Sequence, residues 1–349
     1  MLVASLIWVG CRSTASPMPA QQGVRWIEQL SSTEAGLRGV SAVSADVAWA
    51  SGTAGTCLRT VDGGRTWVIL TVPGAERLDF RDVEALNTNT AWLMATAGRI
   101  YRTTNGGATW QLQLADDKPG IFLDAIAFWD KDNGIAFGDP AGGAFLVLIT
   151  EDGGAHWRRL APSLLPPPLA GEAGFAGSGT CLAVAGTDDV WFGTGGSRVA
   201  RVFHSSDRGH TWQAVAAPVA AGTASAGVFG LAFRNRRTGV AVGGDYKHPQ
   251  SALRTAAVTR NGGRSWQPVH GTVPGGYRSG VAFAPGLGAT VFVAVGTSGA
   301  DISRDDGTSW NSIYRGPLNA VSFAAQGPVG WAVGPDGRIV RIEGTGQKR

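Results

Sequence analysis

The chain has 349 residues, more than one hydrophobic core usually fills, so its length predicts two domains or a repeat architecture. With 44% hydrophobic and only 16% charged residues, the composition excludes intrinsic disorder, and no apolar run is long enough for a transmembrane helix. The 52 glycines and 13 tryptophans at so low a charge favour an all-β chain of short strands and tight turns.

The formal net charge is +4, and only four of the 30 basic residues are lysines. The densest arginine cluster comprises Arg234, Arg236 and Arg237, which is too small and too isolated for a nucleic-acid-binding surface. No basic stripe alternates with aromatic residues. We therefore expect no nucleic-acid partner.

Residues 1–22 have the pattern of an export leader followed by a linker. The apolar run MLVASLIWVG leads into Cys11 and then into small and polar residues. The ending Val9-Gly10-Cys11 resembles a bacterial lipoprotein box, although no basic residue precedes the apolar run. We expect an exported protein, periplasmic or membrane-anchored, with its only membrane contact through a lipid on Cys11; the sequence leaves lipidation open.

A motif of the form [ST]-x-[DN]-x-G-x-[TSH]-W occurs six times, and its tryptophans are 43 to 55 residues apart. This period is typical of four-stranded propeller blades. Asp or Asn beside Gly favours a tight hairpin, and the tryptophan begins the next strand. The motif therefore predicts a structural turn in each blade, with the Asp or Asn supplied by Asp62, Asn105, Asp152, Asp207, Asn261 and Asp305.

An apolar strand and a glycine-punctuated strand precede each motif, and this pair also occurs near Asn319 with no seventh motif after it. The segment VRWIEQL, residues 24–30, resembles the strand that follows a motif, with Trp26 in the place of the motif tryptophan. We therefore predict a seven-bladed β-propeller over residues 23–349, closed by pairing of the N- and C-terminal segments in one blade.

The innermost strands should begin at the face where the central funnel opens. Aligned on their last large apolar residue, they place three arginines at one position and four other polar residues at the next. Two loops should open on the same face, Gly138-Asp139-Pro140 and residues 243–248. Such a ring could clamp an anionic group, or its members could simply pair with one another. The candidate binding residues are Arg38, Arg81, Asp82, Asp124, Asp139, Asp245, Tyr246, Lys247, His248, Tyr277, Arg278 and Asn319.

The longest connection, residues 161–179, has no counterpart in the repeat and carries Glu172 and Phe175. It is either a lid or partner-docking arm over the funnel or a decorative insertion. Cys57 and Cys181 fall in blades 1 and 4, too far apart for a disulfide, so we expect buried free thiols. The five histidines show no metal-ligand spacing, and we expect no metal or cofactor.

The six motifs are similar to bacterial neuraminidase repeats, or Asp boxes. The whole ring, with its segments FRDVEA, FLDAIAFWD and SGTCLAV, resembles the photosystem II stability and assembly factor-like propellers. The resemblance implies the fold and, more weakly, a protein that assists assembly. Relatives carry oxidoreductase or glycosyl hydrolase labels, but this chain has no dinucleotide fingerprint on a βαβ unit, so an NAD or flavin enzyme is disfavoured.

We expect a non-catalytic, monomeric propeller that binds a protein partner or peptide of the cell envelope on its funnel face. The alternative is a sialidase-like glycoside hydrolase acting on an anionic glycan. That enzyme would use Arg38, Arg81 and Arg278 as the arginine triad and Tyr246 or Tyr277 as the nucleophile. Glu84 and Glu172 are the nearest glutamates for pairing with that tyrosine.

Overall fold

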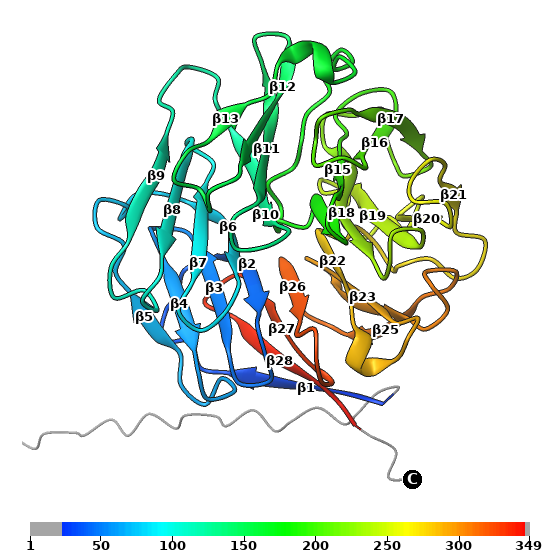
Figure 1. Cartoon of the computed structure of the whole chain (residues 1–349). Helices are drawn as coiled ribbons and strands as arrows, with labels where there is room; N and C mark the ends of the chain where they lie inside the picture. Colours follow the sequence, from blue (N-terminus) through cyan, green and yellow to red (C-terminus); the bar gives the residue numbers. More distant parts are fainter. Residues whose placement is uncertain (1–22, 346–349) are drawn as a thin grey trace, which may run out of the picture.

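The computed structural model describes residues 23–345, and the predicted leader with Cys11 lies outside this range. Seven four-stranded antiparallel sheets surround one axis, which confirms the predicted all-β, seven-bladed propeller (Figure 1). Consecutive strands pair in each of six blades, numbered here in chain order. Neighbouring blades meet along the axis through their innermost strands, the first of each of these sheets.

Blades 1 to 3 occupy the first half of the ring. Blade 1 contains β2 (Leu37–Ala42), β3 (Ala48–Gly52), β4 (Cys57–Thr60) and β5 (Val68–Leu70). Blade 2 contains β6 (Phe80–Ala85), β7 (Ala91–Ala95), β8 (Arg99–Thr103) and β9 (Gln111–Ala115). Blade 3 contains β10 (Leu123–Phe128), β11 (Gly134–Ala141), β12 (Ala144–Thr150) and β13 (Arg158–Arg159), followed by the short 3-10 helix η1 (Pro162–Leu164).

Blades 4 to 6 follow the long connection. Blade 4 contains β14 (Leu182–Ala185), β15 (Asp189–Gly193), β16 (Ala200–Ser205) and β17 (Gln213–Ala217). Blade 5 contains β18 (Ala226–Phe233), β19 (Gly239–Asp245), β20 (Ala256–Thr259) and β21 (Gln267–Pro268). Blade 6 contains β22 (Gly280–Phe283), η2 (Pro285–Leu287), β23 (Phe292–Gly296), β24 (Gly299–Ser303) and β25 (Asn311–Tyr314).

Blade 7 combines strands from opposite ends of the described chain. β26 (Ala320–Phe323), β27 (Val329–Val333) and β28 (Ile339–Gly344) are joined by β1 (Val24–Gln29), which pairs with β28 from Val24↔Gly344 to Gln29↔Ile339 (Figure 1). Trp26 is buried in the position of a motif tryptophan and stacks on Tyr314 with a centroid distance of 4.7 Å. Blade 7 is thus a four-stranded antiparallel sheet like the others, with β1 as its outer strand.

The hydrophobic core is divided among the spaces between blades. Four of its largest fully buried side chains, Trp49, Trp92, Trp191 and Trp331, come from the second strand of their blades. Cys57 and Cys181 are buried free thiols, as expected, and burial raises the pKa of both. Within the described residues, no helix is long and apolar enough to cross a membrane.

The six Asp boxes form one recurring hydrogen-bond network at the third hairpin of their blades. In blade 1, the Thr60 hydroxyl donates to Asp62 at 2.9 Å and accepts the Gly64 N–H at 2.8 Å. Asp62 also accepts the N–H of Thr66, four residues after it in the same turn. The other five boxes repeat these three contacts, with Asn105 and Asn261 accepting through their amide oxygens. Four boxes have glycine at both central positions of the turn, whereas Arg208 and Asp306 take the first position in blades 4 and 6 with a positive φ of 58° and 59°.

Candidate binding site on the funnel face

A hollow of about 500 Å³ opens where the innermost strands begin, at the end of the axis away from the Asp boxes. We call it the funnel hollow. Residues from six of the blades, all except blade 4, line it together with part of the long connection after blade 3. The lining residues are Arg38, Arg81, Phe122, Asp124, Asp139, Gly174, Phe175, Ala176, Gly177, Phe229, Tyr246, Tyr277, Ser279, Thr297 and Asn319.

A recurring irregularity of the innermost strands positions several of these side chains. Four of these strands skip one residue in their pairing with the second strand, at Arg38, Arg81, Asp124 and Phe229. Such an unpaired residue is a β-bulge, which turns a side chain out of the regular alternation of the strand. In blades 6 and 7, Ser279 and Asn319 precede the strand at the same place, and their N–H groups donate to Val295 and Val333.

This register corrects the predicted alignment of the three arginines. Arg38 and Arg81 share the bulge position with Asp124 and Asn319, whereas Arg278 falls one residue earlier and Asp82 one residue later. Alignment on the last large apolar residue failed because that residue is not at one register: β10, β22 and β26 end in Phe, whereas β2 and β6 end in Ala. The predicted triad of Arg38, Arg81 and Arg278 is therefore not assembled.

Arg278 is instead part of a buried ion pair. It is only 2% exposed, and its guanidinium donates to Asp301, with the Nε to Oδ2 distance at 2.6 Å. Further bonds reach the Tyr277 carbonyl and the Ser298 hydroxyl, both at 2.8 Å. All of these partners belong to blade 6, so Arg278 has a structural role there and is not available to a ligand in the funnel hollow.

Arg38 is the arginine of the hollow whose guanidinium is not held in an ion pair. Among the described residues, no hydrogen bond or ion pair is formed by its guanidinium, and its Nε is buried. Burial and then the neighbouring Arg81 lower the pKa of Arg38, and the negative charge of Asp79 offsets only part of this. Arg81, by contrast, donates to Asp79 at 2.6 Å and to the Ala176 carbonyl at 3.1 Å. The two adjacent guanidiniums favour an anion at this side of the hollow.

Two carboxyl groups lie on the neighbouring side. Asp124 is 0% exposed, and neither of its oxygens has a hydrogen bond of normal geometry in the described structure. Burial and the nearby Asp139 raise the pKa of Asp124 well above its usual range. Asp139 accepts the Gly174 N–H at 2.8 Å, and burial raises the pKa of this carboxyl too. The hollow therefore carries a cationic side and an acidic side, next to each other.

The third component of the hollow is aromatic. Phe175 stacks on Phe229 with a centroid distance of 3.9 Å, and Tyr277 and Tyr246 meet the ring of Phe229 edge-on. Tyr246 is 47% exposed, so it offers a free ring face at the rim. Tyr277 is buried, and burial raises its pKa, which opposes a role as an ionised nucleophile.

The long connection lies over the funnel hollow and is held there by a buried ion pair. Glu172 is 4% exposed and accepts from Arg201 Nε at 2.8 Å and from the Thr194 hydroxyl at 2.6 Å. Ala173 then pairs with Gly195 across an antiparallel bridge, and Phe175 to Gly177 line the hollow. Because Glu172 is committed to Arg201, it is not a free partner for a catalytic tyrosine.

Other predicted residues lie outside the funnel hollow. Asp82 accepts the N–H groups of Val83 and Ile126, both at 2.9 Å. Its carboxyl lines a different hollow of about 270 Å³ among the innermost strands, which we call the axial channel. Glu84 lines the same channel; burial raises the pKa of Asp82 to about 7, and burial with repulsion from Asp82 raises that of Glu84 to about 8. Asp245 is held in its own loop by His248 and by the Lys247 N–H, and Lys247 and His248 are exposed outside the hollow.

Sequence reasoning missed Phe122, Phe229 and Thr297. Phe229 could have been found from the sequence. It comes directly after an apolar residue, Val228, at the beginning of an innermost strand, and Arg38 follows Leu37 in the same way. Phe122 is brought in by the chain before β10, and Thr297 by the β23–β24 hairpin. Neither has a recurring neighbour pattern, so only the folded ring brings them to the hollow.

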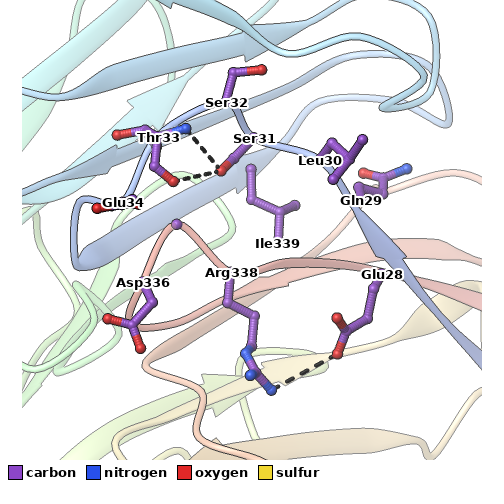
Figure 2. A pocket seen from close by; sticks show the side chains of 11 residues that line it. Glu28, Gln29, Leu30, Ser31, Ser32, Thr33, Glu34, Asp336, Arg338 and Ile339 are labelled. Atoms are coloured by element: carbon purple, nitrogen blue, oxygen red, sulfur yellow. Dashed lines mark hydrogen bonds and ion pairs between the residues drawn. The ribbon is translucent and has the colours of Figure 1, made fainter. Parts of the chain in front are cut away.

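A second hollow of about 500 Å³ lies at the rim of blade 7, between the segment after β1 and the β27–β28 hairpin (Figure 2). Glu28, Glu34 and Asp336 make its lining acidic, and Arg338 approaches Glu28 at 3.8 Å (Figure 2). No group of three potential metal ligands occurs anywhere in residues 23–345. The rim hollow lacks the paired arginines and the aromatic side chains that line the funnel hollow.

Comparisons with known proteins place the chain in context. The model of the photosynthesis system II assembly factor YCF48 family matches residues 20–122, whereas no curated protein matches the sequence. The structure of YCF48 bound to a D1 peptide is similar over 93% of this chain and 98% of that one, with 18% identity and a TM-score of 0.62. YCF48 from Cyanidioschyzon merolae matches over 91% and 98%, with 19% identity and a TM-score of 0.63.

A glycoside hydrolase shares the fold as well. The GH74 xyloglucanase from Xanthomonas campestris is 16% identical over 92% of this chain and 53% of its own, with a TM-score of 0.64. Identities this low establish the propeller fold and leave the chemistry to the site itself. The predicted resemblance is thereby confirmed: the chain resembles the photosystem II assembly factor family, in sequence over residues 20–122 and in fold over nearly its whole described length.

Proposed function

We propose that this protein is an exported, non-catalytic propeller that binds a protein partner, through an extended peptide segment, in the funnel hollow, and acts as an assembly factor. The observation that carries the proposal is the unpartnered guanidinium of Arg38. A partly desolvated cation without a counterion costs free energy in the unbound protein, and an anionic ligand group would remove that cost.

The rest of the lining suits a peptide. Arg38 and Arg81 would hold a carboxylate, from either a chain terminus or an acidic side chain, and Phe229 and Tyr246 would pack against neighbouring apolar side chains. The similar YCF48 structure contains a bound D1 peptide, which supports a peptide as the ligand class. A sialidase-like reaction receives no such support, because Arg278, Glu172 and Tyr277 are committed elsewhere or buried.

Export is the part of the proposal that rests on sequence alone. The apolar run before Cys11 and the small residues after it have the composition of a leader. The partner would then be a protein of the cell envelope. Metabolic labelling with a fatty-acid probe, in native cells and with Cys11→Ala, separates a lipidated form from a cleaved or unprocessed one.

The test of binding is co-purification from envelope extract with the tagged chain, comparing the native sequence with Arg38→Ala. We expect loss of the co-purifying partner with Arg38→Ala and retention with Arg65→Ala, an exposed arginine in the blade 1 Asp box at the opposite face. Direct affinity is then measured on peptides from that partner by fluorescence anisotropy. Equal recovery by all three proteins, or by none, would refute the proposal.

A further inference from the structure

Three blades share an arginine that links each blade to the next. In each case a tryptophan of the second strand pairs with an arginine of the third strand, whose guanidinium lies over the indole 5.2 to 5.3 Å from its centroid. The guanidinium then reaches the first glycine of the Asp box in the following blade or a carbonyl beside it. The pairs are Trp49–Arg59, Trp92–Arg102 and Trp331–Arg341.

Blade 4 has the tryptophan but not the arginine. His204 pairs with Trp191 in the same register, and the two rings stack with a centroid distance of 4.7 Å and an interplanar angle of 4°. The imidazole Nε2 lies 2.9 Å from Asp189 Oδ1 within the same blade. The shorter side chain therefore does not reach Gly262, the first glycine of the blade 5 Asp box. A hollow of about 580 Å³ lies at this junction, lined by both His204 and Gly262. We call it the box-face hollow.

The linking contact between blades 4 and 5 runs in the reverse direction. Arg236, in the β18–β19 loop of blade 5, donates its Nε to the buried carboxylate of Asp189 in blade 4. Asp189 also contacts His204, so its carboxylate is already paired with Arg236 and His204 at the wall of the hollow. Burial lowers the pKa of His204 in spite of its contact with Asp189, which disfavours a charged imidazole there.

Two further arginines line the box-face hollow without a counterion. Within residues 23–345, the side chains of Arg237 and Arg264 form no ion pair or hydrogen bond. The lining therefore has three guanidiniums against one carboxylate, with the Ser206 side chain beside them. The sequence cluster of Arg234, Arg236 and Arg237 is divided by the fold, because Arg234 turns away to Asp306 at 2.6 Å.

We infer that the box-face hollow is a binding site for a phosphate-type oxyanion, independent of the partner site in the funnel hollow. Two uncompensated guanidiniums, with a third anchored through Asp189, match a dianion better than a single carboxylate, since each guanidinium can donate two parallel bonds. Phosphate can come from solution or from a lipid headgroup; the site chemistry is the same for both.

The test is calorimetric titration of the full-length protein with inorganic phosphate at low ionic strength. We expect Arg237→Ala with Arg264→Ala to weaken binding by about tenfold or more, because two charge-assisted contacts are lost. Arg65→Ala is the matched control, since Arg65 has the same place in the blade 1 box as Arg264 in blade 5. Unchanged affinity in the double variant, or equal weakening by Arg65→Ala, would overturn the inference.

A second variant distinguishes binding in the box-face hollow from non-specific electrostatic attraction of phosphate to a basic surface. His204→Arg restores the linking arginine, which should fill the hollow and weaken phosphate binding although it adds a positive charge. Tighter binding by His204→Arg would show non-specific attraction and contradict the inference. Flotation with vesicles containing phosphatidic acid assigns the source: capture that depends on Arg237 and Arg264 indicates a headgroup, and phosphate binding without capture indicates a soluble ligand.

Discussion

The Asp-box face, at the turns after the third strands, and the funnel face, where the innermost strands begin, lie at opposite ends of the blades but use polar residues in different ways. At the box face, one hydrogen-bond network is repeated in six blades, and each box Asp or Asn has its partners within five residues. At the funnel face, the equivalent bulge position holds a different residue in almost every blade, and two of them, Arg38 and Asp124, lack ordinary hydrogen bonds.

This contrast distinguishes polar residues that stabilise the fold from polar residues that are available to bind a ligand. A repeated, satisfied polar group contributes to folding, whereas an unsatisfied buried one is a cost that folding alone does not explain. The box-face hollow supports the same rule, since it lies where His204 interrupts a linking arginine found in three other blades. The sites proposed above are therefore the places where the repeat is broken.

The largest effect should come from a satisfied buried charge. Asp301→Ala leaves Arg278 buried without its counterion, and we expect a loss of about 3–5 kcal/mol in the free energy of unfolding, measured with urea. The control is Asp117→Ala, which removes an exposed partner of Arg99 and should cost about 0–1 kcal/mol. Equal losses in the two variants would contradict the structural role of the Arg278 pair.

A smaller loss is expected for one Asp box. Asp305→Ala removes acceptors of the Ser309 N–H and hydroxyl and of the Ser303 hydroxyl, which should cost about 1–2 kcal/mol in urea unfolding. Asn105→Asp is the matched exchange, because Asp occupies this position in four other boxes and keeps the acceptor. It should leave the urea midpoint nearly unchanged, and a loss as large as that of Asp305→Ala would refute the shared role.

The axial channel between the two faces should make stability pH-dependent. The folded pKa values of Asp82 and Glu84 are raised, to about 7 and about 8, above the ordinary carboxyl range near ~4. The folded state therefore binds more protons than the unfolded state, and its stability should fall as pH rises from ~5 to ~8. Glu84→Gln should flatten the urea midpoint over this range; an unchanged pH profile would show that this carboxyl is not responsible.

Arg38 should contribute least to stability and most to binding of the partner. Arg38→Ala removes a guanidinium that contacts no counterion, so the free energy of unfolding should change by no more than about 0.5 kcal/mol. The same variant should lose the partner in co-purification. A marked drop in the thermal unfolding temperature would instead assign Arg38 to the fold, and would remove the contrast between the two faces.

The number of blades and the place of each turn were predictable from sequence, because a turn depends on neighbouring residues. The Ser or Thr, the Asp or Asn and the glycines of each box lie within five positions, and Trp26 marked the outer strand of blade 7. The angular order around the axis also follows from chain order in a ring of blades.

The contents of the two hollows depended on tertiary structure. Arg278 lies one residue before the position that Arg38 and Arg81 share, and only strand pairing shows this offset, since these strands end in different residue types. Arg236 meets Asp189 only because two blades pack side by side, 47 residues apart in the chain. Local turn chemistry can be read along the sequence, whereas charge neutralisation between blades is decided by distances in the folded ring.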